Sequence, residues 1–177
     1  MRVAVPPPRA VRAAAIRFVI DAYEGVAVRP GKGLPHAQAV ADVLRDAGAD
    51  ERTQLAALLH DVVEDTPRDV DDVRTAFGDE LAATVGALSE DKGIERYAQR
   101  KRALRTQVAL ASDPAVMDIA LADKIASLRL AALTATPISR RKLAHYGATL
   151  RLALDGHAAP ALTLELTRLL RAIHAWP

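Results

Sequence analysis

Apolar residues recur at helical spacing along most of the chain. In the segment 8–23, Val11, Phe18 and Val19 fall on one side of a helix, and Gly25 lies just beyond its end. The same spacing predicts helices over further segments: 37–47, 51–60, 68–77, 79–89, 94–111, 114–133, 139–154 and 160–175. Alternating strand patterns and Asn-Gly hairpin signals are absent. The sequence therefore predicts an all-α fold, a bundle of about eight or nine helices.

Glycine and proline mark the ends of several of these helices. Gly48 separates two of them at a C-cap position, and we expect this pair to pack as a helical hairpin. Asp113 and Pro114 supply the N-cap and the first residue of a helix that extends to about Leu133.

The composition narrows the class of protein. Half of the 177 residues are apolar, which is enough to bury one core and predicts a single domain over residues 8–177 after a disordered tail at 1–7. The formal net charge is only +2, and no basic stripe is interleaved with aromatic residues, so we expect no nucleic-acid partner. The sequence has no membrane-spanning run, signal peptide or cysteine, so we expect a cytoplasmic protein without a membrane partner. The oligomeric state stays open.

Four ionisable side chains lie within six positions at the end of an apolar segment. The run 56–59 is followed directly by His60 and Asp61, and Glu64 and Asp65 come one turn later. Charged groups rarely end a core-facing helix unless a polar or metallic partner is there. An imidazole and a carboxylate on one turn can bind a divalent cation, and nearby acids can deprotonate a water bound to it. This cluster indicates hydrolysis.

Two residues elsewhere in the chain can complete the coordination sphere of such a cation. His36 opens an amphipathic helix just after a loop rich in glycine and proline. Asp123 interrupts a run of alanine, isoleucine and leucine, where a lone buried carboxylate would be costly. Any single histidine on an apolar face is more often a satisfied core residue than a ligand. Four such groups in this order favour a metal site.

The two acids have a competing explanation as part of a helix start. Thr66 can act as an N-cap, with Pro67 at the first helical position and Asp69 closing a capping box. This capping accounts for those three residues but does not require Glu64 and Asp65. These two therefore remain the candidate catalytic acids.

The order of these motifs resembles the HD phosphohydrolase superfamily. The sequence His36, His60-Asp61, Asp123 follows its pattern, and the acid pair after His60-Asp61 resembles the hydrolase domain of the Rel/SpoT alarmone enzymes. Further motifs recur in order in the metazoan-type small alarmone hydrolases: Phe77-Gly78, Ser89-Glu90-Asp91-Lys92, Gln99-Arg100-Lys101-Arg102, Leu121-Ala122-Asp123-Lys124 and Leu128-Arg129. The resemblance extends from about residue 16 to about residue 154, and it implies an HD-type helical bundle.

The resemblance also implies roles for individual residues. The implied metal ligands are His36, His60, Asp61 and Asp123. The family's metal is usually manganese, and two imidazoles with two carboxylates suit octahedral manganese or iron(II) better than a closed zinc site, so we expect one Mn²⁺ ion. Glu64 and Asp65 resemble the catalytic acids. The implied reaction removes the 3′-pyrophosphate of guanosine tetraphosphate or pentaphosphate (ppGpp) as one unit.

We expect the nucleotide substrate to be bound by six residues: Arg29, Lys32, Arg96, Lys124, Ser127 and Tyr146. Arg29 and Lys32 lie on a loop, where binding groups are common, although this loop is about three residues shorter than in the family. Ser127 stands where the family often has asparagine, and this shorter side chain reaches ribose or phosphate less well. Tyr146 matches a family aromatic residue that contacts the nucleotide, although it could equally be a core residue.

The basic residues around these positions allow two interpretations. Arg96 belongs to a charge run that is most often a solvated helix face, but it lies near the position of the family's phosphate-binding lysine. Lys124 and Arg129 either neutralise the pyrophosphate or pair with nearby acids.

Three functions fit the sequence. The first is a manganese-dependent alarmone hydrolase. The second keeps the site but changes the substrate, as in a phosphatase of a nucleotide or of a phosphorylated cofactor such as NADPH, and Ser127 and the short loop favour it. The third is a catalytically idle module that binds a nucleotide or a protein, which has no need for Glu64 and Asp65.

Overall fold

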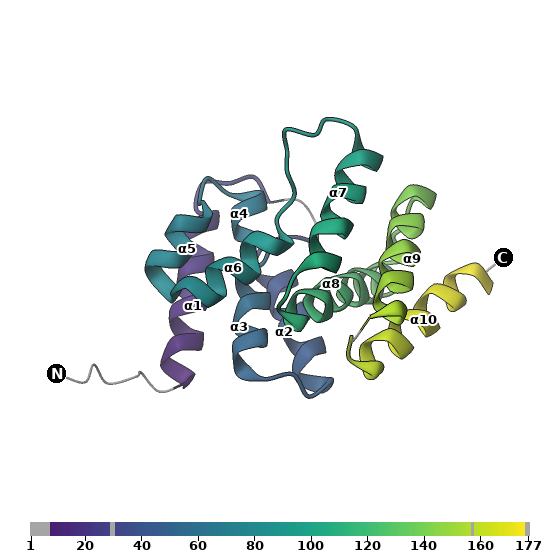
Figure 1. Ribbon diagram of the computed structural model, residues 1–177, viewed down its shortest axis with the longest axis horizontal. Coiled ribbons are helices and arrows are strands. Elements are labelled where there is room, and N and C mark those ends of the chain that lie inside the picture. Colours follow the sequence, from purple (N-terminus) through teal and green to yellow (C-terminus); the bar gives the residue numbers. More distant parts are fainter. Residues whose placement is uncertain (1–7, 29–30, 157, 176–177) are drawn as a thin grey trace.

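The structure is a computed structural model that describes residues 8–28, 31–156 and 158–175. These residues form ten helices and no strands (Figure 1): α1 (Pro8–Tyr23), α2 (Leu34–Asp46), α3 (Glu51–Leu59), α4 (Val62–Asp65), α5 (Val70–Phe77), α6 (Asp79–Leu88), α7 (Tyr97–Leu110), α8 (Pro114–Leu133), α9 (Arg140–Asp155) and α10 (Pro160–Ala175). Within the described ranges nine helices have at least eight residues, and α4 is a single turn. The predicted all-α fold is confirmed. The predicted disordered tail, residues 1–7, lies outside the described residues.

The longest helix, α8, is the centre of the bundle. Six other helices pack against it: α2, α3, α6, α7, α9 and α10. Asp113 caps the helix as predicted, because its carboxylate accepts a hydrogen bond from the Ala115 amide at 3.0 Å. Since neighbours surround α8, apolar side chains such as Ile119, Leu121 and Ile125 are fully buried on several sides of it. The site residue Asp123 is carried by this enclosed helix.

The predicted hairpin of two helices is formed by α2 and α3, which pack against each other. Helix α2 ends with Ala47 at the C-cap, and Gly48 follows with a φ of +82°. Only glycine adopts this left-handed backbone without strain, so that the chain can turn back into α3. The Asp50 side chain then caps α3 by accepting a hydrogen bond from the Thr53 amide at 2.7 Å.

The predicted N-cap at Thr66 is wrong. The Thr66 hydroxyl donates to the Val62 carbonyl at 2.8 Å and ends α4 instead of starting the next helix. Helix α5 begins at Val70 with Asp69 as its N-cap, and Asp72 completes a capping box with Asp69. The chain between the candidate catalytic acids and α5 is therefore a separate short turn.

The helices are arranged so that one end of the molecule holds α1, α4, α5 and α6 and the other holds α9 and α10 (Figure 1). Phe18 of α1 meets Phe77 of α5 edge to face, with ring centroids 5.2 Å apart. Helices α2, α3, α7 and α8 lie between these two ends. None of the described helices combines the length and the apolar character needed to cross a membrane.

Candidate metal centre and active site

A cavity of about 510 Å³ lies among the loop before α2 and the helices α2, α4, α7, α8 and α9. This volume is within the range of small-molecule sites in proteins. Its wall includes His36, His60 and Asp61, as well as Asp123 from the middle of α8. Residues that are far apart in the sequence therefore meet around one cavity.

Three of the predicted metal ligands form a tight cluster in this wall. His36, His60 and Asp61 each offer one ligand atom, and these atoms all lie within 4.8 Å of one another. The Asp61 carboxylate lies between the two imidazoles: Oδ1 is 3.3 Å from His60 Nε2, and Oδ2 is 3.9 Å from His36 Nε2. All three residues are buried, so that a cation here would be held by protein groups within a low-dielectric environment.

His60 shows that this cluster is suited to a metal ion. Its Nδ1 lies 2.7 Å from the Ala57 carbonyl, which can only accept, so the ring proton is on Nδ1. The lone pair of Nε2 consequently faces the cluster, where this atom is buried and has no hydrogen-bond partner among the described residues. Metal-binding histidines usually donate a hydrogen bond from their second ring N–H to a carbonyl or carboxylate in this way. A divalent cation would be a suitable partner for this Nε2 atom.

The fourth predicted ligand adjoins the cluster from α8. Asp123 Oδ1 lies 3.0 Å from His36 Nε2, and Oδ2 lies 3.3 Å from Lys124 Nζ. Burial alone would raise the pKa of Asp123, but the Lys124 charge and the His36 hydrogen bond hold this pKa well below its usual value. Asp123 therefore presents an ionised carboxylate beside His36, where it could serve as the fourth ligand.

The two candidate catalytic acids have different surroundings on α4. Glu64 is in the cavity wall, and burial raises the pKa of its carboxyl group. Asp65 does not line the cavity, and its Oδ2 pairs with Lys32 Nζ at 3.0 Å. Lys32 also donates to Asp61 Oδ2 at 2.8 Å, so its ammonium group links Asp61 to Asp65. Of these two acids, Glu64 is therefore the one that lines the cavity.

The predicted substrate-binding residues are only partly brought together. Those that line the cavity are Lys32, Lys124, Ser127 and Tyr146. Tyr146 is buried, and the ammonium groups of Lys124 and Lys142 each lie 5.8 Å from its ring centroid. Arg96 is exposed at the N-cap of α7 and is not among the residues of the cavity wall. Arg29 lies outside the described residues.

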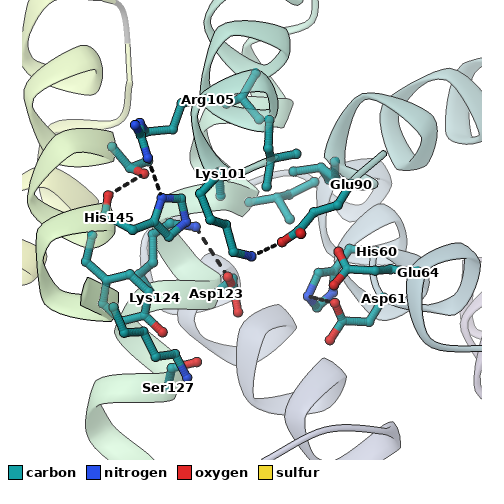
Figure 2. Close-up of a pocket in the computed structure, with 18 of the residues that line it drawn as sticks. His60, Asp61, Glu64, Glu90, Lys101, Arg105, Asp123, Lys124, Ser127 and His145 are labelled. Atoms are coloured by element: carbon teal, nitrogen blue, oxygen red, sulfur yellow. Dashed lines mark hydrogen bonds and ion pairs between the residues drawn. The ribbon is translucent and has the colours of Figure 1, made fainter. Parts of the chain in front are cut away.

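The cavity wall also contains polar residues that the sequence analysis did not place in the site: Glu90, Lys101, Arg105, Arg141, Lys142 and His145. Glu90 is nearly inaccessible, accepts a 2.6 Å hydrogen bond from Arg100 Nε, and pairs with Lys101 Nζ (Figure 2). The sequence did contain a pattern that could have identified the cavity-lining face of α7. Residues 97, 101, 104, 105 and 108 line the cavity, and this spacing is that of one helix face.

Comparison with known proteins places the chain in a family. The HD domain family matches residues 15–150, which is more than half of the chain, so the chain belongs to the HD domain family. The resemblance proposed from its motifs is confirmed.

Several relatives within this family share the site region. The chain is 33% identical to the Escherichia coli bifunctional (p)ppGpp synthase/hydrolase SpoT over 129 residues, which cover 70% of the chain and 18% of SpoT. It is 40% identical over 80 residues to the Drosophila melanogaster guanosine-3′,5′-bis(diphosphate) 3′-pyrophosphohydrolase MESH1, covering 45% of the chain and 44% of that protein. Over 98 residues it is 36% identical to the Streptomyces coelicolor GTP pyrophosphokinase, covering 54% of the chain and 12% of that protein. The matches thus span less than half the length of each of these relatives.

Two solved structures resemble most or nearly all of the bundle. One is described as a metazoan ortholog of SpoT that hydrolyses ppGpp and plays a role in starvation responses. It superposes with a TM-score of 0.75 and 26% identity, covering 97% of this chain and 98% of its own. A Listeria monocytogenes protein superposes with a TM-score of 0.67 and 28% identity, covering 78% of this chain and 97% of its own. The arrangement of helices around the cavity is therefore that of the HD fold.

Proposed function

We propose that the protein is a metal-dependent HD phosphohydrolase that removes the 3′-pyrophosphate of ppGpp, leaving GDP or GTP. The observation that carries this proposal is the buried Nε2 of His60, which has no hydrogen-bond partner in the described part of the chain. This atom faces His36 and Asp61 in the wall of a cavity of nucleotide size. The names of SpoT and MESH1, which include ppGpp hydrolysis, support the same substrate.

The proposed cofactor is a single Mn²⁺ ion. The residues that would hold it are His36, His60, Asp61 and Asp123. Two imidazoles and two carboxylates leave room for water ligands, which suits an octahedral ion. Such an ion, when bound, lowers the pKa of a coordinated water and polarises a phosphoryl oxygen.

Proton transfer, charge neutralisation and contact with the base are assigned to residues that line the cavity. Glu64 lines the cavity, and its raised pKa suits a group that accepts the proton of the attacking water. The water oxygen forms a bond to the phosphorus attached to the 3′ oxygen. The bond between that phosphorus and the 3′ oxygen breaks, and the 3′ oxygen takes up a proton. Lys101 and Lys124 neutralise charge on the departing pyrophosphate. Tyr146 offers an aromatic surface to the base.

The identity of the released phosphate tests this proposal. Purified protein with Mn²⁺ is expected to release pyrophosphate from ppGpp, and a matched sample with EDTA is expected to release none. Release of orthophosphate alone, across a panel that includes NADPH, would indicate a nucleotide or cofactor phosphatase instead. Metal-loaded protein that turns over no phosphate ester would indicate an idle binding module.

We also propose that the protein acts in the cytoplasm. A chain without cysteine is compatible with a reducing compartment. Fractionation of cells that express the protein with a detectable tag tests this location, and recovery outside the cytoplasmic fraction would contradict it.

A further inference from the structure

His145 presents a fixed hydrogen-bond donor at one end of the cavity. Arg105 Nη1 lies 2.8 Å from His145 Nδ1, and a guanidinium group can only donate, so Nδ1 is the acceptor. The proton of the neutral ring is therefore on Nε2. The residue is only 6% exposed, it lines the cavity, and Nε2 has no hydrogen-bond partner among the residues that the structure describes. This N–H group is free for a ligand that accepts hydrogen bonds.

The surroundings of His145 keep the ring neutral and electropositive. Burial, followed by the charges of Lys124, Lys101 and Arg105, lowers the pKa of His145 to about 3. The ring therefore remains a neutral donor at physiological pH. Arg141 and Lys142 add two further cations to the same wall. Such a concentration of donors around a cavity suits an anion.

Glu90 also lines the cavity, but it does not neutralise the Arg105–His145 pair. Glu90 is engaged by Arg100 and Lys101, and it belongs to the side of the cavity that faces Glu64 (Figure 2). No carboxylate contacts Arg105 or His145 in the described part of the chain. The Arg105–His145 pair thus keeps its donors available to a bound molecule.

This basic end is separate from the candidate metal centre. In Figure 2, Arg105 and His145 lie on the side of Asp123 that faces away from His60 and Asp61. Among the charges that act on His145, Asp123 is the one metal-site residue. A phosphate group at the metal centre and one at His145 would therefore occupy two different places in the cavity.

We propose that Arg105 and His145 form a second anion subsite, which binds the phosphate or diphosphate group of the substrate that is not cleaved. His145 contacts that group through Nε2, and Arg105 both contributes charge and holds the ring in the required tautomer. This inference rests on the proposed function. It implies a nucleotide substrate that carries phosphate groups at two separate positions. A nucleotide with phosphate groups at one position would fill only one of the two places in the cavity.

Binding of GDP in the presence of EDTA tests the subsite without catalysis. GDP carries a diphosphate at the 5′ position and no phosphate at the 3′ position. With EDTA present, the candidate metal centre holds no cation that could attract this diphosphate. The variant Arg105→Gln has a matched control in Arg102→Gln, because Arg102 is on the same helix but is exposed and does not line the cavity. The variant His145→Phe removes the donor, whereas His145→Gln retains an N–H group.

We expect Arg105→Gln and His145→Phe to weaken GDP binding, measured by calorimetry, by about tenfold or more, as loss of a hydrogen bond to a charged group typically does. Arg102→Gln should stay within about twofold, and His145→Gln should retain most of the affinity. Thermal unfolding of each variant verifies that it is folded. Equal binding by all four variants, equal losses in Arg102→Gln and Arg105→Gln, or no GDP binding by the wild-type protein would overturn the subsite.

The same variants separate this inference from the proposed function. If ppGpp is the substrate, Arg105→Gln should raise KM by about tenfold and change kcat little, since it removes binding that is equal in the ground state and the transition state. If the wild-type protein releases no pyrophosphate but GDP binding follows the expected pattern, the subsite stands and the proposed reaction is wrong.

Discussion

Asp113 joins three helices at the start of α8, and its replacement measures how firmly the helix that carries Asp123 is anchored. Arg52 of α3 donates two hydrogen bonds of 2.9 Å to its carboxylate, and Thr84 of α6 donates one of 2.7 Å. The carboxylate also caps α8 through the Ala115 amide. Asp113→Ala removes all of these contacts at once and leaves the Arg52 guanidinium without its carboxylate partner.

The expected cost of Asp113→Ala follows from these contacts. Loss of an N-cap costs about 1 kcal/mol. The Arg52 pair and the Thr84 hydrogen bond add about 0.5–1 kcal/mol each, because the side chains of Asp113 and Arg52 remain 24% and 35% exposed and solvent screens their charges. The free energy of unfolding should therefore fall by about 2–3 kcal/mol. For a chain of this length that corresponds to roughly 5–10 °C in Tm.

The contribution of the Asp113 charge depends on pH with a defined sign. The Arg52 hydrogen bonds lower the pKa of Asp113 from 3.8 to about 2 in the folded protein. Because the folded-state pKa is the lower of the two, the stabilisation is complete above about pH 4 and is lost as the pH falls towards 2. Asp113→Asn keeps a good capping residue but loses the charge. Its difference in stability from the wild type should thus shrink over this pH range.

Urea unfolding followed by circular dichroism measures both effects. Asp46→Asn is the matched control, because Asp46 is 63% exposed in a surface pair with Arg45 and should cost less than about 0.5 kcal/mol. A change of less than 0.5 kcal/mol for Asp113→Ala at pH 7 would refute this account of the contacts. A gap between Asp113→Asn and the wild type that is the same at pH 6 and pH 2.5 would refute the role of the charge.

Three further variants test the site and the core. Asp61→Ala should abolish Mn²⁺ binding in calorimetry together with turnover, and metal binding that survives would remove Asp61 from the ligand set. Glu64→Gln should bind Mn²⁺ normally but slow pyrophosphate release by roughly two to four orders of magnitude, whereas normal turnover would make its assigned role wrong. Leu59→Ala, at a fully buried position beside His60, should lower the free energy of unfolding by about 2–5 kcal/mol in urea, and a cost under 1 kcal/mol would contradict its place in the core.

Local signals in the sequence accounted for most of the helices. The first, eighth and tenth helices begin at Pro8, Pro114 and Pro160, close to the predicted positions, because proline is favoured in a first turn whatever surrounds it. The start of α7 was predicted three residues too early. Gly93 and Ile94 are held in a turn by Asp91, through its side chain and its carbonyl, and this competes with helical hydrogen bonding.

The candidate site also combines features that are local in the sequence with residues that only the fold brings together. The adjacency of His60 and Asp61 at the end of an apolar helix is a local feature, so it indicated metal chemistry without any coordinates. The order of the remaining motifs resembled the HD family strongly enough to name His36 and Asp123. The cavity then brought these residues together.

The sequence by itself determined the helical class and most helix ends and named the candidate cation-binding residues, since each of these depends on neighbouring residues or on motif order. Only the tertiary structure decided which basic side chains line the cavity. Arg96 is exposed, whereas Lys101 and Arg105 line the cavity together with the half-buried Leu104 and the buried Val108. The rotation of α7 about its own axis is fixed by how those apolar residues pack against other helices, and that packing requires contacts between segments distant in the chain.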